Sequence, residues 1–203
     1  MSLTAKETGS ARIDPVDEGV YTAVCVGLVD IGLQEKVYEG KKKEQEQIIV
    51  IWELIGETYE TSAGFMPRTI SKTYTNSLHE RSALRKDLKA WRGREFTPEE
   101  LAGFDLTKLL GAPCQLQIIH RETSNGTFAN ISAIMALPKG MPRPKPDSKI
   151  FMFDIDADDA ESALESLPNW MQERIKKSPT WTGRSAGNIE PAAEADDDGD
   201  LPF

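Results

Sequence analysis

Alternating apolar and polar residues divide the first two thirds of the chain into short strands. A first strand is predicted over residues 19–31, with a bend at Gly27, because this stretch is rich in β-branched residues and contains few glycines. A second strand is predicted over residues 48–54, where residues of both parities are apolar, as in a strand buried on both faces. Residues 68–75 alternate and are rich in threonine, which predicts a third strand with one polar face.

One clear helix is predicted to follow the third strand. Ser77 and Glu80 have the spacing of a capping box, and Gly93 marks the end of the helix. Between them, apolar residues recur at helical spacing, at Leu84, Leu88 and Trp91. Residues 97–100 and 106–110 predict two further short helical turns.

Two more strands complete the pattern. They are predicted over residues 113–121 and 127–137, joined by a hairpin at Asn125-Gly126. Three strands, a helix and two strands is the order of the OB-fold, a five-stranded Greek-key barrel. The pattern therefore predicts a mainly β protein, with an OB-fold β-barrel and helical insertions over residues 19–137.

The segments around the predicted barrel differ from it in composition. Residues 1–18 predict a flexible lead-in. Residues 138–149 alternate proline with lysine and arginine, which predicts a stiff basic connector; it leads into an acidic, partly helical extension that ends at residue 177. Residues 178–203 have little apolar surface to bury and are predicted to form a disordered acidic tail.

The net charge of −9 is located in the C-terminal quarter of the chain. Residues 1–150 carry 20 basic and 20 acidic side chains, whereas residues 151–203 carry 4 basic and 13 acidic ones, and 4 minus 13 is −9. A neutral segment of this length can bury one sizeable core, so we expect one domain with an appendage. Its basic residues cluster in 36–43, 81–94 and 139–149, as binding to a polyanion requires.

Composition argues against several classes of protein. No apolar run approaches the ~20 residues that cross a bilayer, and the polar N-terminus has no apolar signal core, so neither a membrane protein nor an exported one is expected. Cys25 and Cys114 lie in apolar strands and are expected to be reduced core residues. His79 and His120 have no second histidine or cysteine at ligand spacing, so we expect no zinc site and no other cofactor.

Catalytic motifs are not evident either. The sequence shows no nucleophile–base pair and no glycine-rich phosphate loop, so we do not expect an enzyme. A calcium-loop pattern has ligands at four of its positions, formed by Asp154, Asp156, Asp158 and Glu165. Asp159 stands where that loop needs glycine for its sharp turn, so we expect Asp158 to cap a short helix instead.

The last residues combine acidic side chains with a bulky apolar end. They are Asp196, Asp197, Asp198, Gly199, Asp200, Leu201, Pro202 and Phe203. A phenylalanine in this setting can enter an apolar pocket rimmed by arginine or lysine, while the aspartates contact a basic surface outside. The alternative is a tail that only keeps the protein soluble.

This segment resembles the acidic C-terminal tip of the single-stranded-DNA-binding proteins of bacteria and their phages, with Gly199 interrupting the acidic run. In that family the DNA-binding part is an OB-fold, and the tip recruits replication, recombination and repair proteins. The resemblance implies a bacteriophage-type protein that binds single-stranded DNA without sequence specificity in the cytoplasm of a bacterial host cell. The helix near residues 77–94 and the insertion over 97–110 look more like a phage-encoded version than the bacterial core.

Single-strand binding needs cations for phosphates and aromatic faces for bases. OB-folds present these groups on strands two and three and in the loops that join strands one to two and four to five. The candidates in these places are Lys36, Tyr38, Lys41, Lys42 and Lys43 in the first loop, Arg68, Lys72 and Tyr74 on one face of the third strand, and Arg121 at the second hairpin. Trp52 shares its face with apolar neighbours and is expected in the core instead.

Three questions stay open at this level. The first is the role of a basic stripe on the helix, which either covers the apolar seam, contacts DNA or docks the acidic tail. The stripe is formed by Arg81, Arg85, Lys89 and Arg92. The alternative function is that of a protein-interaction adaptor with an OB-like domain that does not bind DNA. The pattern does not decide whether the chain forms a homo-oligomer.

Overall fold

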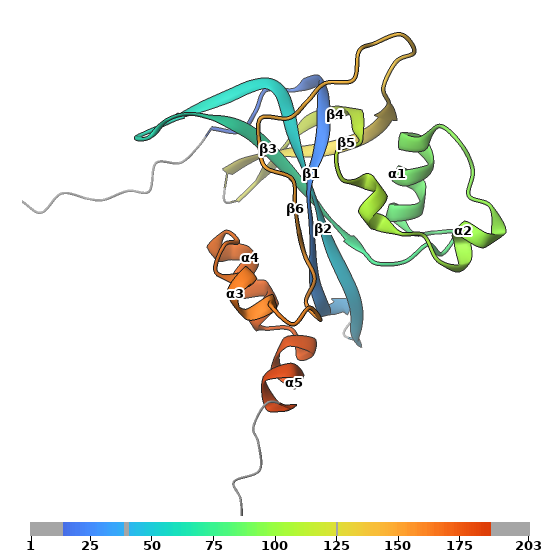
Figure 1. Cartoon of the computed structure of the whole chain (residues 1–203), viewed down its shortest axis with the longest axis vertical. Helices are drawn as coiled ribbons and strands as arrows, with labels where there is room; N and C mark the ends of the chain where they lie inside the picture. The colour runs from blue at the N-terminus through green and yellow to red at the C-terminus, as the bar shows by residue number, and fades with distance from the viewer. Residues whose placement is uncertain (1–13, 39–40, 125, 188–203) are drawn as a thin grey trace, which may run out of the picture.

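Within the part of the chain that the structure describes, six strands form a single sheet (Figure 1). The computed structural model describes residues 14–38, 41–124 and 126–187, with side chains for all of these except 36–38, 41 and 185–187. The strands are β1 (Gly19–Tyr38), β2 (Lys41–Thr61), β3 (Gly64–Thr75), β4 (Pro113–Thr123), β5 (Gly126–Ala136) and β6 (Phe151–Phe153). The predicted mainly β class is confirmed.

The five long strands are antiparallel in the order β3-β2-β1-β4-β5, and β6 pairs in parallel with β1. β3 and β5 lie at the two edges, and among the described residues no ladder joins them, so the predicted closed barrel is wrong. Residues 14–16 line the space between the edges, together with residues of β3 and with Ala129 of β5. The N-terminal segment thus occupies the place where a closing ladder would form.

This N-terminal segment is held by hydrogen bonds. Arg68 of β3 donates to the carbonyl oxygen of Asp14 at 2.8 Å, and Nε2 of His120 on β4 lies 2.8 Å from the carbonyl oxygen of Val16. Val16 is buried. Residues 14–18 therefore pack against the sheet, which corrects the predicted flexible lead-in for this part; residues 1–13 lie outside the described ranges.

Three helical segments connect β3 to β4, namely α1 (Ala83–Arg92), α2 (Pro98–Ala102) and the 3-10 helix η1 (Leu106–Leu109). The predicted apolar seam of α1 is confirmed, since Leu84, Leu88 and Trp91 are buried. The short turn predicted at residues 97–100 is also confirmed, because Thr97 and Glu100 form the capping box of α2.

The start of α1 differs from the prediction. Ser82 is the N-cap, and its Oγ accepts a hydrogen bond from the amide of Arg85 at 3.1 Å. The same Oγ donates to the carbonyl oxygen of Ser77 at 2.6 Å, and the Oγ of Ser77 accepts from the amide of His79 at 3.1 Å. Ser77 therefore closes a local turn that competes with helix formation, and the predicted Ser77–Glu80 capping box is wrong.

The sheet separates two hydrophobic cores. The core on the α1 side contains alternate residues of β1 and β2, among them Leu28, Val50 and Trp52. The core on the other face contains the intervening residues, among them Val29, Ile49 and Ile51. Residues 48–54 are apolar at both parities because each face of β2 is buried in a different core, as predicted for this strand. Trp52 and both cysteines are buried core residues, also as predicted.

The C-terminal extension supplies the second core. It comprises β6, α3 (Ala160–Leu164), α4 (Asn169–Lys176) and α5 (Pro179–Gly187). Figure 1 shows α1 and α2 on one side of the sheet and α3, α4 and α5 on the other. The prediction that the extension before residue 177 is partly helical is confirmed by α3 and α4. α3 begins after Asp159, which makes no side-chain capping bond, so the prediction that Asp158 caps this helix is wrong.

The disorder predicted from residue 178 onward is wrong for residues 178–187. Ser178 is buried, and the amide of Leu33 on β1 donates to Oγ1 of Thr180 at 3.0 Å. Arg184 of α5 donates to the carbonyl oxygens of Ile155 and Ala157 at 2.9 and 2.6 Å. Tertiary hydrogen bonds therefore hold α5 where the composition alone indicates a tail.

Two residues of the sheet attach the extension. Gly27 lies at a bulge of β1, as the predicted bend indicated, and a Cβ at this position would lie 2.8 Å from the ring of Phe151 on β6. Glu53 of β2 is buried, and its carboxylate accepts hydrogen bonds from the amides of Asp147 and Ser148 at 2.8 and 2.6 Å.

None of the described helices has the length and apolar character needed to cross a membrane.

Candidate nucleic-acid interface

The predicted first loop is a two-stranded ribbon. β1 and β2 continue to pair beyond their buried parts, with Lys36 opposite Lys43 and Tyr38 opposite Lys41. The loop prediction for these residues is therefore wrong, because pairing that begins in the two cores propagates along a polar segment with no apolar alternation of its own. Lys42 forms an exposed ion pair of 3.1 Å with Glu35.

The predicted face of β3 points toward α1. Nζ of Lys72 lies 2.7 Å from Oδ2 of Asp87 on α1, and the hydroxyl of Tyr74 donates to the same oxygen at 2.8 Å. Tyr74 is only 3% exposed, and burial, followed by the charge of Asp87, raises its pKa above the usual range. Tyr74 is a core residue, so the prediction that it lies on an open DNA-binding face is wrong, and Lys72 is part-exposed and ion-paired with Asp87.

The two predicted arginines lie away from the ribbon. Arg68 is turned toward the carbonyl oxygen of Asp14, while Arg121 is exposed near the β4–β5 hairpin. Gly19, at the start of β1, pairs with Ile118 of β4, and Lys36 lies 17 residues further along β1 (36 minus 19). At ~3.3 Å per residue this is about 55 Å of strand. Arg121 is therefore far along the sheet from the lysines of the ribbon.

The basic stripe of α1 is largely paired within the molecule. Lys89 forms an ion pair with Glu95, and Arg92 forms one with Glu100. Arg85 donates to the carbonyl oxygen of Leu78 at 3.3 Å. These contacts favour the interpretation of α1 as a surface helix whose long side chains cover its apolar seam.

The connector between β5 and β6 is basic, with four cations and one exposed carboxylate, that of Asp147. Its four cations are all exposed, and none belongs to an ion pair among the described residues: Lys139, Arg143, Lys145 and Lys149. Figure 1 shows the connector leaving the end of β5, crossing above the sheet and descending into β6. Its far end is held by the two hydrogen bonds to Glu53.

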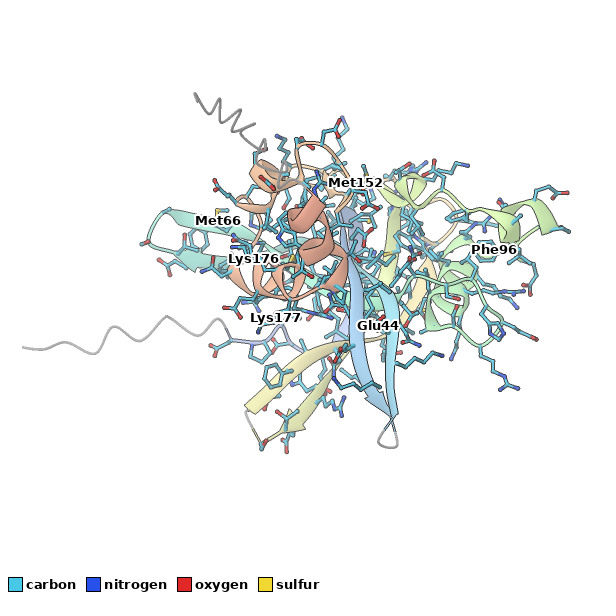
Figure 2. All side chains as sticks on the ribbon, turned by 90° about the horizontal axis from the view of Figure 1, so that it is seen from below. Glu44, Met66, Phe96, Met152, Lys176 and Lys177 are labelled. Atoms are coloured by element: carbon cyan, nitrogen blue, oxygen red, sulfur yellow. The ribbon has the colours of Figure 1, made fainter. Side chains whose placement is uncertain are left out.

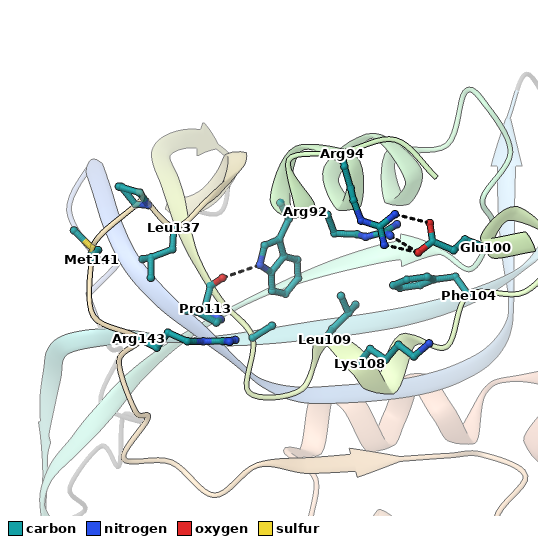
Figure 3. A pocket seen from close by; sticks show the side chains of 13 residues that line it. Arg92, Arg94, Glu100, Phe104, Lys108, Leu109, Pro113, Leu137, Met141 and Arg143 are labelled. Carbon is teal, nitrogen blue, oxygen red and sulfur yellow. Dashed lines mark hydrogen bonds and ion pairs between the residues drawn. The ribbon is translucent and has the colours of Figure 1, made fainter. Parts of the chain in front are cut away.

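A pocket of about 560 Å³ lies at the β5 end of the connector (Figure 3). We name it the α1 pocket, and it is lined by Trp91, Arg92, Arg94, Glu100, Phe104, Lys108, Leu109, Ala112, Pro113, Leu137, Pro138, Met141 and Arg143. Glu100 is paired with Arg92 and Arg94, and hydrogen bonds from Arg94 and from the amide of Thr97 lower its pKa to about 2. Figure 3 shows Lys108 and Arg143 on the opposite side from this pair of arginines.

The aromatic rings of the α1 pocket are used internally. Trp91 packs against Trp52 with ring centroids 5.7 Å apart, and its Nε1 donates to the carbonyl oxygen of Pro113 at 2.9 Å. Phe104 meets Phe96 edge-on and has the guanidinium of Arg92 4.9 Å from its centroid. Both rings are thus engaged in contacts within the protein, and the groups that the pocket offers to a phosphate are its arginines and Lys108.

A second hollow, of about 600 Å³, lies at the β6 end of the connector. We name it the β6 groove, and it is lined by Val26, Ile51, Thr69, Ser71, Ser148, Lys149, Phe151, Met152, Phe153, Ala163, Ser166, Leu167, Pro168, Trp170 and Met171. Its floor is apolar, its walls carry hydroxyl groups, and Lys149 is the one charged residue among the described residues that line it. Trp170 is 46% exposed.

A further basic surface lies beside the β1–β2 ribbon. Arg174 of α4 donates to Thr73 of β3 at 3.2 Å and to Gln47 of β2 at 3.0 Å, and its carbonyl oxygen accepts from Gln34 of β1 at 3.3 Å. The end of α4, with the exposed Lys176 and Lys177, is thereby placed next to the lysine-bearing part of the ribbon. Figure 2 shows these two lysines and Phe96 on opposite sides of the β1 and β2 strands.

The sequence predicted part of this interface. The alternation of proline with cations in 138–149 marked the connector as basic, but nothing in the sequence places the two hollows at its ends or Trp170 beside it. The tip residues, Asp196 to Asp198, Asp200, Leu201, Pro202 and Phe203, lie outside the described residues. Among the residues that are described, no three His, Cys, Asp or Glu side chains are grouped so that they could hold a metal ion.

The sequence was compared with models of known protein families and with curated proteins, and neither comparison finds a match.

Proposed function

We propose that this protein binds single-stranded DNA without sequence specificity. The observation that carries the proposal is the connector: four exposed cations without an acidic partner lie on a segment that joins two hollows. Phosphates bind to spaced cations of this kind, and bases require apolar hollows beside them. A proline-rich segment with both ends fixed holds its cations at nearly constant spacing, which reduces the entropy lost on binding.

The arrangement of strands supports the same proposal. The order β3-β2-β1-β4-β5 is that of an OB-fold opened between its third and fifth strands, and α1 lies between β3 and β4 in the chain as the helix of an OB-fold does. OB-folds are partly open barrels whose main use is the binding of oligonucleotides and oligosaccharides. The resemblance of the acidic tip, residues 196–203, adds the proposal that it recruits replication or recombination proteins in a phage-infected bacterial cell.

The test is a titration of fluorescently labelled oligo-dT and of duplex DNA, followed by anisotropy at several salt concentrations. We expect tight binding to oligo-dT, weaker binding to duplex, and an affinity that falls steeply with salt. Each single-strand phosphate contact adds about −0.7 to the slope of log K against log salt. The double variant K145Q/K149Q should therefore flatten this slope by about 1.4.

A matched control removes two exposed cations from elsewhere. Arg81 and Lys86 are exposed on α1 and belong to no ion pair among the described residues. R81Q/K86Q should leave the slope close to that of the unmodified protein. Equal losses in the two double variants would show that only net charge matters, and no binding to oligo-dT at any salt would favour the protein-interaction adaptor.

A further inference from the structure

The β6 groove combines features that neither the sheet nor the extension has by itself. One wall is formed by Thr69 and Ser71 on the outer face of β3, and both residues are exposed. The other wall is formed by the α3–α4 turn and by Trp170 of α4. Residues separated by about a hundred positions in the chain therefore face one hollow, which exists only because the extension packs on the sheet.

Trp170 differs from the other tryptophans of the chain. Trp52 and Trp91 are buried in the first core, and Trp181 is half-buried beside the second core. Trp170 is 46% exposed, although indole is among the side chains that gain most from burial. It lies at the start of α4, on a helix anchored by the buried residues Met171 and Ile175, so its backbone is held rigidly at the edge of the groove.

The groove also has suitable polar groups for a base. Hydroxyls of Thr69, Ser71, Ser148 and Ser166 line it. The hydroxyl of Ser166 donates to the carbonyl oxygen of Ala163 at 2.7 Å and can only accept from a base, whereas the other three can donate or accept. Carboxylates, which would repel a phosphate, do not occur among its described lining residues. Lys149 lies at its rim, where the row of connector cations ends.

We propose that the β6 groove is the base-stacking part of the DNA interface, with Trp170 as its platform; this rests on the proposed function. The single-stranded DNA runs along the connector, and its phosphates contact Lys145 and Lys149. One or two of its bases enter the groove and stack against Trp170 and Phe151. Hydroxyl groups that serve both as donors and as acceptors make this contact tolerant of base identity. The C-terminal extension is thus part of the binding site.

An acidic peptide and a second copy of this chain are less suited to the groove. A peptide with several carboxylates needs several cations close together, and the described lining of the groove holds one, Lys149. A second copy of this chain that covered Trp170 would bring its own connector cations close to those of the first copy. The repulsion between these like charges would oppose the contact.

Two variants of Trp170 test the proposal in the full-length chain with fluorescently labelled oligo-dT. Trp170→Ala should weaken binding about 5- to 150-fold, which is the range for stacking one base. Trp170→Phe should retain much of the affinity but lose most of the DNA-dependent quenching of intrinsic fluorescence, because the other tryptophans are buried or half-buried. Far-UV circular dichroism checks that both variants are folded.

Phe65 provides the matched control, because at 74% exposure it is the most exposed large apolar residue described and lies near the β2–β3 hairpin, outside the groove. Phe65→Ala should bind oligo-dT as the unmodified protein does. A second, independent variant is Ser71→Glu, which places a negative charge in the wall of the groove and should weaken binding without removing a core contact.

The outcomes separate this inference from the proposed function. If the unmodified protein binds oligo-dT but Trp170→Ala and Ser71→Glu bind equally well, the groove is not the stacking site and the DNA-binding function still stands. If the unmodified protein does not bind, the function itself is wrong. If Trp170→Ala changes the oligomeric state in analytical ultracentrifugation and leaves DNA binding unchanged, the groove holds a second copy and the inference is overturned.

Discussion

Asp87 binds two of the residues that were predicted to contact DNA, Lys72 and Tyr74. Its carboxylate forms an ion pair with Lys72 and accepts a hydrogen bond from the hydroxyl of Tyr74, so the three side chains form a partly buried network between β3 and α1. The spacing of Arg68, Lys72 and Tyr74 correctly indicated that they share one face. Only the position of α1, packed over that face, shows that the face is the inner one.

The first prediction concerns this network. Asp87→Ala leaves the half-buried Lys72 and the buried Tyr74 hydroxyl without their acceptor, and should lower the free energy of unfolding by ~1–3 kcal/mol. Urea unfolding followed by circular dichroism measures the change. Glu95→Ala removes the exposed partner of Lys89 and should cost less than ~1 kcal/mol. Equal losses would mean that the Asp87 network adds nothing beyond an ordinary surface pair.

The second prediction concerns Asp30 of β1. Burial raises the pKa of its carboxyl, although the hydrogen bond from the amide of Gly32 opposes this, and the nearby Asp154, Asp156 and Glu46 raise it further. Because the folded-state pKa lies above the unfolded value, the charged form opposes folding at neutral pH, and the stability of the protein gains from protonation as pH falls through that raised pKa.

Asp30→Asn keeps an oxygen that can accept from Gly32 and removes the charge. It should therefore be more stable than the unmodified protein at pH 7, and the difference should shrink as pH falls toward 3.8, the ordinary pKa of an aspartate side chain. Thermal unfolding from pH 7 to pH 4 measures this difference. A difference that stays constant with pH would show that Asp30 titrates as an ordinary carboxylate.

At the scale of elements, strand identity was predictable and strand length was not. The apolar parts of β1 and β2 define where these strands are buried, and the prediction found those parts. The polar continuation into the lysine ribbon has no pattern of its own, because pairing there is inherited from neighbouring buried residues. In the same way, Ser77 was predicted to cap α1, but the local turn that it closes leaves Ser82 as the N-cap.

The third prediction concerns the contact between β1 and β6. Gly27→Ala would place a Cβ 2.8 Å from the ring of Phe151 and 3.1 Å from Ile51, so the ring has to move. We expect a loss of ~1–3 kcal/mol in the free energy of unfolding, typical of overpacking in a core. Gly103→Ala is the control, since its Cβ would meet no atom within 4 Å. If both variants unfold alike, β6 does not pack as closely as described.

At the scale of the whole molecule, the C-terminal extension was predicted to be an appendage, but in the structure it forms a layer that covers one face of the sheet. The domain boundary predicted at residue 138 follows a real change in composition, but Ile155, Leu164 and Ile175 complete the core on the second face of the sheet. A sheet with two apolar faces needs two covering layers, and the first 137 residues supply one.

The fourth prediction follows from this arrangement. A chain that ends at residue 187 should keep the thermal unfolding temperature of the full protein, because both cores are intact. A chain that ends at residue 149 exposes Val29, Ile49 and Ile51 and should be aggregated or unfolded. Size-exclusion chromatography and circular dichroism distinguish these outcomes. A stable, monomeric chain ending at 149 would show that the extension is not part of the folded core.

The sequence by itself determined the mainly β class, the doubly buried second strand, the buried cysteines and Trp52, and the basic character of the connector. Each of these follows from local periodicity or local composition, which the chain carries wherever it folds. Tertiary structure alone decided that the sheet stays open between β3 and β5, that Lys72 and Tyr74 meet Asp87, and that Trp170 lines the same groove as Thr69 and Ser71. Such contacts join residues far apart in the chain, and they depend on which apolar faces find each other, information that no single stretch of sequence contains.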